Sequence, residues 1–119
     1  MKLLIIDDEP AILETVEMRM RRDGFTTFTA DSAEEGMRLF RRIKPDLVIL
    51  DIMLPHENGF QLIGHIRNKK SWHEVPIVML TARSQEHDIT RALEAGANDY
   101  VIKPFRPNEL MARIRRLIT

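Results

Sequence analysis

The stretch Asp46-Leu47-Val48-Ile49-Leu50-Asp51 decides the fold, because four apolar residues stand without polar alternation between two acids. Such a run is typical of a strand that is buried on both faces in a parallel sheet. Leu3–Ile6 and Ile77–Leu80 have the same character, and two further short runs lie at Phe25–Phe28 and Tyr100–Ile102. The sequence therefore predicts five strands.

Segments with helical spacing lie between these runs and after the last one. Their apolar residues recur three or four positions apart, which places each series on one helical face. The series are Ile12, Val16 and Met20; Ala33, Met37 and Phe40; Leu62 and Ile66; Ile89 and Leu93; and Leu110, Ile114, Leu117 and Ile118. Strand and helix thus alternate five times. This (βα)5 pattern predicts an α/β domain, a doubly wound parallel sheet with helices on both faces.

Length and composition favour one soluble domain over residues 1–119. The chain has 44% hydrophobic and 30% charged residues, no cysteine, and eighteen basic residues against eighteen acidic ones. The balanced charge argues against direct binding of nucleic acid or of a membrane surface. Near the N-terminus, the apolar run Leu3–Ile6 is too short for a secretory signal or a membrane span. We therefore expect a cytoplasmic protein.

Polar residues follow the predicted strands at their carboxyl ends. Asp7 and Asp8 follow the first strand, Asp51 the third, Thr81 the fourth and Lys103 the fifth. Open parallel sheets bind ligands outside these ends, near the point where the strand order reverses. We therefore expect three carboxylates, a hydroxyl and an ammonium to converge on one edge of the sheet.

This combination of groups has a specific chemistry. Three neighbouring carboxylates repel one another unless a cation lies among them, and oxygen ligands open to water suit Mg²⁺. Lys103 adds a second positive charge, and the Thr81 hydroxyl can donate to a phosphoryl oxygen. The set indicates attack by a carboxylate on phosphorus, which gives an aspartyl phosphate.

With these residues placed, the sequence resembles the receiver domain of two-component response regulators over essentially its whole length. The resemblance implies a flavodoxin-like strand order of 2-1-3-4-5. It rests on Ile5-Ile6-Asp7-Asp8-Glu9, Asp46-Leu47-Val48-Ile49-Leu50-Asp51, Pro55 and Gly59, Leu80-Thr81-Ala82, Gly96-Ala97-Asn98-Asp99-Tyr100 and Lys103-Pro104-Phe105.

The resemblance implies a phosphorylation site with bound Mg²⁺. Asp51 would accept a phosphoryl group from the phosphohistidine of a sensor histidine kinase. Asp8 would bind the metal directly and Asp7 partly through water, with Asp51 and the backbone carbonyl of Met53 as further ligands. The domain would thus be a signalling switch that assists its own phosphorylation and dephosphorylation, and it would not be an enzyme acting on a free metabolite.

The resemblance also implies how the switch works. Thr81 and Tyr100 match a pair in which the hydroxyl moves onto the phosphoryl group and the ring turns inward behind it. Lys103 matches the lysine that pairs with the phosphoryl oxygens, and the Lys103–Pro104 peptide bond is expected to be cis.

The segment 105–115 resembles the subfamily whose output is a winged-helix DNA-binding domain. Such receivers dimerise through the face of the fourth helix, fifth strand and fifth helix. The matching interchain pairs would be Arg91 with Glu109 and Asp99 with Arg113. The chain would then be the N-terminal part of a longer regulator, with an output such as transcription.

Two other functions use the same residues. A small Mg²⁺-dependent phosphohydrolase would use Asp51 as a nucleophile, but such enzymes usually carry an acid two residues later, where this chain has Met53. A phosphorylation-independent interaction module would leave Thr81 and Lys103 without a role beside the acids.

Overall fold

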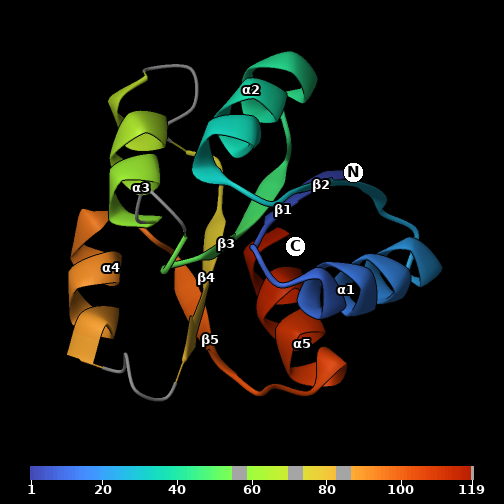
Figure 1. Cartoon of the computed structure of the whole chain (residues 1–119). Helices are drawn as coiled ribbons and strands as arrows, with labels where there is room; N and C mark the ends of the chain where they lie inside the picture. The colour runs from blue at the N-terminus through green and yellow to red at the C-terminus, as the bar shows by residue number, and fades with distance from the viewer. Residues whose placement is uncertain (55–58, 70–73, 83–86, 119) are drawn as a thin grey trace.

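Five strands alternate with five helices along the described residues of the computed structural model (Figure 1). The structure describes residues 1–54, 59–69, 74–82 and 87–118, so Pro55 lies outside it. The strands are β1 (Lys2–Ile6), β2 (Thr26–Ala30), β3 (Leu47–Asp51), β4 (Ile77–Ala82) and β5 (Asp99–Lys103). The helices are α1 (Pro10–Arg22), α2 (Ala33–Ile43), α3 (Gly59–Asn68), α4 (Ile89–Ala95) and α5 (Pro107–Ile118).

The strands form one parallel sheet in the order β2-β1-β3-β4-β5, which confirms the predicted topology. The strand order reverses where β1 lies beside β3, with Ile6 opposite Leu50. At the same edge, Asp51 lies opposite Leu80 and Thr81 opposite Ile102. The carboxyl ends of four strands therefore meet beside this reversal.

Helices cover both faces of the sheet, with α1 and α5 on one side and α2, α3 and α4 on the other (Figure 1). Successive strand residues point to opposite faces. In β1, Leu3 and Ile5 pack with α1 and α5, whereas Leu4 and Ile6 pack with the other three helices. Both faces are thus buried, as the uninterrupted apolar strands predict. Within the described ranges, no helix is long and apolar enough to cross a membrane.

Local sequence signals set the helix ends. Pro10 and Pro107 are the first residues of α1 and α5, where a missing N–H has no cost. The Ser32 hydroxyl caps α2 by accepting a hydrogen bond from the Glu35 N–H at 3.2 Å. Gly96 ends α4 with φ +124°, a conformation that side-chain-bearing residues rarely adopt.

Two details of the sequence prediction were wrong. Phe25 lies before β2, because its N–H donates to the Met20 carbonyl at the end of α1 and is thereby withheld from the sheet. Leu93 was expected on the buried stripe of α4, but its side chain is 41% exposed and Ala92 is buried instead. In a helix of only seven residues, one small side chain is enough to make the contact with the core.

Candidate functional site

An acidic cluster lies where the carboxyl ends of β1 and β3 meet. Asp7 follows β1 and is fully buried, whereas Asp51 ends β3 and is 5% exposed. Asp8 and Glu9 continue the chain from Asp7 and are exposed. One carboxylate oxygen from each of these four residues lies within 4.8 Å of the others. The structure thus brings together the three predicted carboxylates and adds Glu9.

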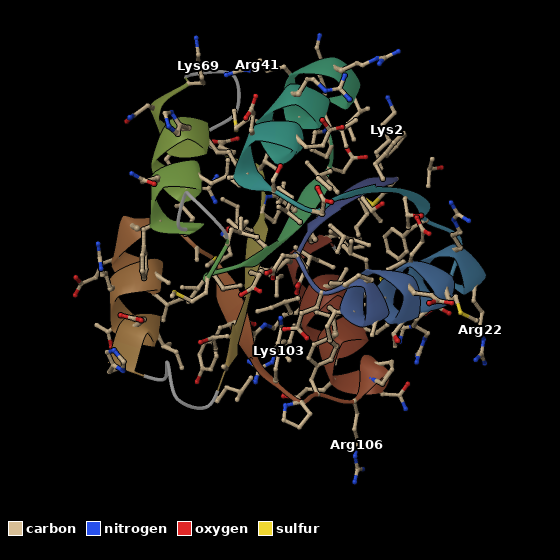
Figure 2. All side chains as sticks on the ribbon, in the orientation of Figure 1. Lys2, Arg22, Arg41, Lys69, Lys103 and Arg106 are labelled. Atoms are coloured by element: carbon tan, nitrogen blue, oxygen red, sulfur yellow. The ribbon has the colours of Figure 1, made fainter. Side chains whose placement is uncertain are left out.

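Lys103, the last residue of β5, extends into this cluster from the other side. Its Nζ lies 2.8 Å from Asp7 Oδ2, 3.0 Å from Glu9 Oε1 and 3.1 Å from Asp51 Oδ2. In Figure 2, Lys103 lies inside the outline of the molecule, while the other five labelled cations extend from its periphery. The Lys103 ammonium is therefore a fixed positive charge that all three carboxylates share.

Burial and the neighbouring charges together set the pKa of Asp51 and of Lys103. Burial, together with the negative charge of Asp7, raises the pKa of the Asp51 carboxyl to about 6, although Lys103 acts in the opposite direction. Burial also opposes the charge on Lys103, but its contacts with Asp7, Asp51 and Glu9 outweigh that cost and raise the pKa of its ammonium. Lys103 is therefore always charged at neutral pH, whereas the Asp51 carboxyl titrates close to neutrality.

The cluster offers the ligands that a hard divalent cation requires. Asp7 Oδ1 accepts a hydrogen bond from the Glu9 N–H at 2.9 Å. The second oxygen, Asp7 Oδ2, is buried and lies 2.8 Å from the Lys103 ammonium. The four carboxylates of the cluster offer oxygen ligands only, a set that fits Mg²⁺.

A small open pocket gives access to these groups. Its volume is about 250 Å³, and it is lined by Asp8, Glu9, Asp51, Met53, Ala82 and Lys103. The Met53 N–H donates to Asp51 Oδ1 at 3.1 Å, which orients the carboxylate. The carboxylates of Asp8, Glu9 and Asp51 are therefore accessible from solvent through this opening.

Gly59 allows α3 to begin directly against the end of β3. Its N–H donates to the Ile52 carbonyl at 2.6 Å. A Cβ at this position would lie 2.9 Å from both the Asp51 carbonyl oxygen and the Ile52 Cα, closer than side chains are found. Gly59 is one of the residues that carry the family resemblance, and the structure gives a steric reason for glycine there, because the backbone of α3 touches that of Asp51.

The other predicted switch residues lie on the adjoining strands. Thr81 is fully buried in β4, and its hydroxyl donates to the neighbouring Ala82 carbonyl at 3.3 Å. Tyr100 is half-buried in β5, with the Arg113 guanidinium 5.9 Å from the centre of its ring. The Lys103–Pro104 peptide bond is cis, the geometry that the resemblance implies.

Of the four residues expected at a dimer face, Asp99, Arg113 and Arg91 make side-chain contacts within the chain, and Glu109 is exposed. The buried Asp99 carboxylate pairs with Arg113 at 3.1 Å and also with Arg116. The Arg91 guanidinium lies 4.1 Å from the centre of the Phe60 ring. Sequence analysis assigned no role to Arg116, Phe60 or Glu9. Of these, only Glu9 could have been found, because it directly follows the Asp7-Asp8 pair at a strand end.

Comparison with known proteins places this arrangement in a family. Residues 3–115 match the response regulator receiver domain. The chain is 41% identical over 114 residues to the DNA-binding response regulator MtrA of Mycolicibacterium smegmatis, covering 96% of this chain and 49% of that protein. It is 39% identical over 117 residues to the phosphate regulon transcriptional regulatory protein PhoB of Escherichia coli, covering 98% and 51%. The chain thus spans about half the length of the curated relatives it matches.

Solved structures of response regulators have the same fold as this chain. The chemotaxis response regulator CheY4 of Vibrio cholerae superposes with a TM-score of 0.92 at 26% identity, over 98% of each chain. A response regulator receiver domain protein from Clostridium thermocellum gives 0.90 at 30% identity, over 98% of this chain and 93% of that one. The match of nearly the entire chain, together with the acidic cluster and its lysine at the carboxyl edge of the sheet, shows that this chain belongs to the response regulator receiver domain family of two-component systems.

Proposed function

We propose that this domain is a phosphorylation-dependent switch in which Asp51 accepts a phosphoryl group from the phosphohistidine of a sensor histidine kinase. The observation that carries the proposal is the Lys103 ammonium, which lies 3.1 Å from the Asp51 carboxylate and 2.8 Å from that of the buried Asp7. The pocket leaves this carboxylate open to an incoming group.

The reaction is a transfer of one phosphoryl group. An oxygen of the ionised Asp51 carboxylate forms a bond to phosphorus while the bond from phosphorus to the histidine nitrogen breaks, and the imidazole leaves with that electron pair. Lys103 pairs with the phosphoryl oxygens. Asp7, Asp8, Asp51 and the Met53 carbonyl would hold Mg²⁺, which would supply positive charge that offsets the oxygens of both partners.

Phosphorylation changes the charge around Thr81. The phosphoryl group carries about −1.5 to −2 charges where the ionised carboxylate carried −1, so the negative charge beside Thr81 and Lys103 grows. The Thr81 hydroxyl, which donates to the Ala82 carbonyl in this structure, would turn to the stronger phosphoryl acceptor. Movement of Thr81 vacates space that Tyr100 fills, and this alters the surface formed by α4, β5 and α5.

That surface would then select a partner. A symmetric homodimer through α4, β5 and α5 would pair Arg91 with Glu109 and Asp99 with Arg113 across the interface. In this chain Asp99 is already neutralised by two arginines, so the second pair requires an exchange of partners. The DNA-binding and transcriptional relatives support a C-terminal output domain that regulates transcription. A regulator of this kind would act in the cytoplasm.

A phosphohydrolase is less well supported. The residue two positions after Asp51 is Met53, whose side chain is 54% exposed and has no proton to transfer. A general acid is therefore absent from the position where such enzymes use one. Release of the phosphoryl group from Asp51 would be hydrolysis of the modified domain itself rather than turnover of a free substrate.

The deciding experiment is the intact mass of the protein after incubation with Mg²⁺ and a small phosphodonor. We expect one phosphoryl group on the native protein, dependent on metal, and none on Asp51→Ala. Asp46→Ala is the matched control, because Asp46 lies at the opposite end of the same strand and should still permit the adduct. Rapid hydrolysis of the donor without an adduct would favour the phosphohydrolase. If neither an adduct nor hydrolysis of the donor were observed, a constitutive interaction module would be favoured.

A further inference from the structure

Helices α3 and α4 lie beside each other on one face of the sheet, and two contacts of different kinds join them (Figure 1). The first lies at their C-terminal ends. Arg67 of α3 donates from Nε to the Gly96 carbonyl at 3.0 Å and from Nη2 to Asn98 Oδ1 at 2.9 Å. Asn98 Oδ1 also accepts from the Ile77 N–H at 2.8 Å. This end of α4 is therefore bonded to both α3 and β4.

The turn at this end packs closely against Arg67. A Cβ on Gly96 would lie 2.8 Å from Arg67 Cγ, so the turn rests directly on the arginine side chain. Part of the Arg67 guanidinium is buried, with Nη1 out of contact with water. Hydrogen bonds of a partly buried charge are among the stronger non-covalent contacts, and their loss is costly.

The second contact lies at the N-terminal ends of the helices, near the acidic cluster. The Arg91 guanidinium of α4 stacks on the Phe60 ring of α3 at 4.1 Å. Arg91 is exposed and Phe60 is half-buried. Phe60 follows Gly59, whose backbone touches that of Asp51 and Ile52. The stack therefore links the first turn of α4 to the acceptor strand, through a contact that is weak in water.

We propose that α4 is hinged at its Gly96 end by Arg67, and that the Arg91–Phe60 stack is the releasable contact that holds its other end in the unphosphorylated arrangement. Phe60 and Arg91 are then positioning residues, which act on the switch through α4. The proposal rests on the proposed function, because it assumes that phosphorylation of Asp51 shifts α4. Release of the stack also frees Arg91 for the proposed interchain pair with Glu109.

Thermodynamic linkage makes the proposal measurable. A contact present only in the unphosphorylated arrangement opposes every ligand that favours the phosphorylated one. Loss of the stack in Phe60→Leu should therefore tighten the binding of beryllofluoride, which mimics a phosphoryl group. The expected gain in affinity is about two- to fivefold, because an exposed cation–π contact contributes a free energy of that size. Binding is followed by ¹⁹F NMR during titration of the Mg²⁺-loaded protein.

Matched variants separate positioning from general loosening. Phe60→Tyr retains an aromatic face and should keep the native affinity. The double variant Phe60→Leu with Arg91→Ala should bind no more tightly than either single variant, since each removes the same contact. Arg67→Lys breaks the contact at the hinge end, which both arrangements retain, so it should lower the urea midpoint of unfolding without tightening beryllofluoride binding.

The outcomes distinguish the two proposals. If the native protein takes no beryllofluoride, the proposed function fails and the hinge fails with it. If the native protein binds and Phe60→Leu binds equally well, only the hinge is overturned. Equal tightening in Phe60→Leu and Arg67→Lys would also overturn it, because general loosening of α4 would then explain both.

Discussion

Along β1 and β3, the charged side chains nearest the amino end of the central sheet are exposed and those nearest its carboxyl end are buried. At the amino end, the Lys2 N–H donates to Asp46 Oδ2 at 2.7 Å, and Lys2 Nζ donates to the Ile43 carbonyl at 3.1 Å. Both groups are exposed and each has a partner. At the carboxyl end, carboxylates of Asp7 and Asp51 are buried around a single ammonium, that of Lys103.

The carboxyl end of the sheet is therefore where charge burial opposes the stability of the fold. Burial of two carboxylates beside each other opposes folding unless a cation or a proton compensates. The pKa of Asp51, raised to about 6, reflects this conflict. Lys2 and Asp46 at the amino end are exposed to solvent and avoid this cost. A site that is poorly neutralised by the protein alone would be stabilised by a bound metal ion, in agreement with the proposed function.

The largest expected effect is at the shared ammonium. We expect Lys103→Met to slow phosphorylation of Asp51 by a small phosphodonor about 10²–10³-fold, because a positioned charge at a reacting phosphoryl group contributes on this scale. Lys2→Met at the amino end is the matched control and should leave the rate within about twofold, since an exposed charge this far away is screened. The rates come from intact masses over time. A similar loss of phosphorylation rate in Lys103→Met and Lys2→Met would contradict the special role assigned to the ammonium at the carboxyl end.

The second prediction compares two aspartates at opposite ends of β3. In the absence of metal, Asp51 holds its proton in the native state up to a pKa of about 6, against 3.8 as the ordinary value. Its contribution to stability is therefore complete below about pH 4 and is lost as pH rises through 6. Asp51→Asn, which does not titrate, should exceed the native protein in unfolding free energy by about 1–3 kcal/mol at pH 7, and by little at pH 4.

Asp46→Asn should behave in the opposite manner. Asp46 accepts a hydrogen bond from the Lys2 N–H, so its replacement should lower the unfolding free energy by up to about 1 kcal/mol at pH 7. Urea denaturation with a chelator present measures both variants. A gain for Asp51→Asn that stays constant from pH 4 to pH 7 would contradict the assigned burial cost.

The sequence predicts the fold and the central site because their determinants are local. The uninterrupted apolar run Leu47–Leu50 predicts a strand buried on both faces, and the acid after it marks the carboxyl end. Parallel strands place such ends at one edge, so Asp7, Asp51 and Lys103 could be brought together without coordinates. The errors at Phe25 and Leu93 arose where a hydrogen bond or a short helix, rather than periodicity, decides the position.

Contacts between side chains of different helices could not be predicted in the same way. The stack of Arg91 on Phe60 joins residues 31 positions apart, and neither residue belongs to a spacing pattern. Arg67 likewise meets Gly96 only because α3 and α4 lie beside each other. Such pairs depend on the angle and depth at which helices pack, which the apolar pattern leaves undetermined.

The smallest expected effect is at Glu9, which distinguishes the edge of the cluster from its centre. The Glu9 side chain is 57% exposed and 3.0 Å from Lys103 Nζ. Because exposed pairs contribute only about 0–1 kcal/mol, Glu9→Gln should weaken Mg²⁺ binding by no more than about threefold. Asp8→Asn should weaken it at least about tenfold, since it removes an expected direct ligand. Calorimetric titration with Mg²⁺ compares them, with Glu34→Gln on α2 as the neutral control. An equal loss in Glu9→Gln and Asp8→Asn would make Glu9 a ligand rather than a neighbouring charge, and the metal would then lie further from β1 than the sequence implies.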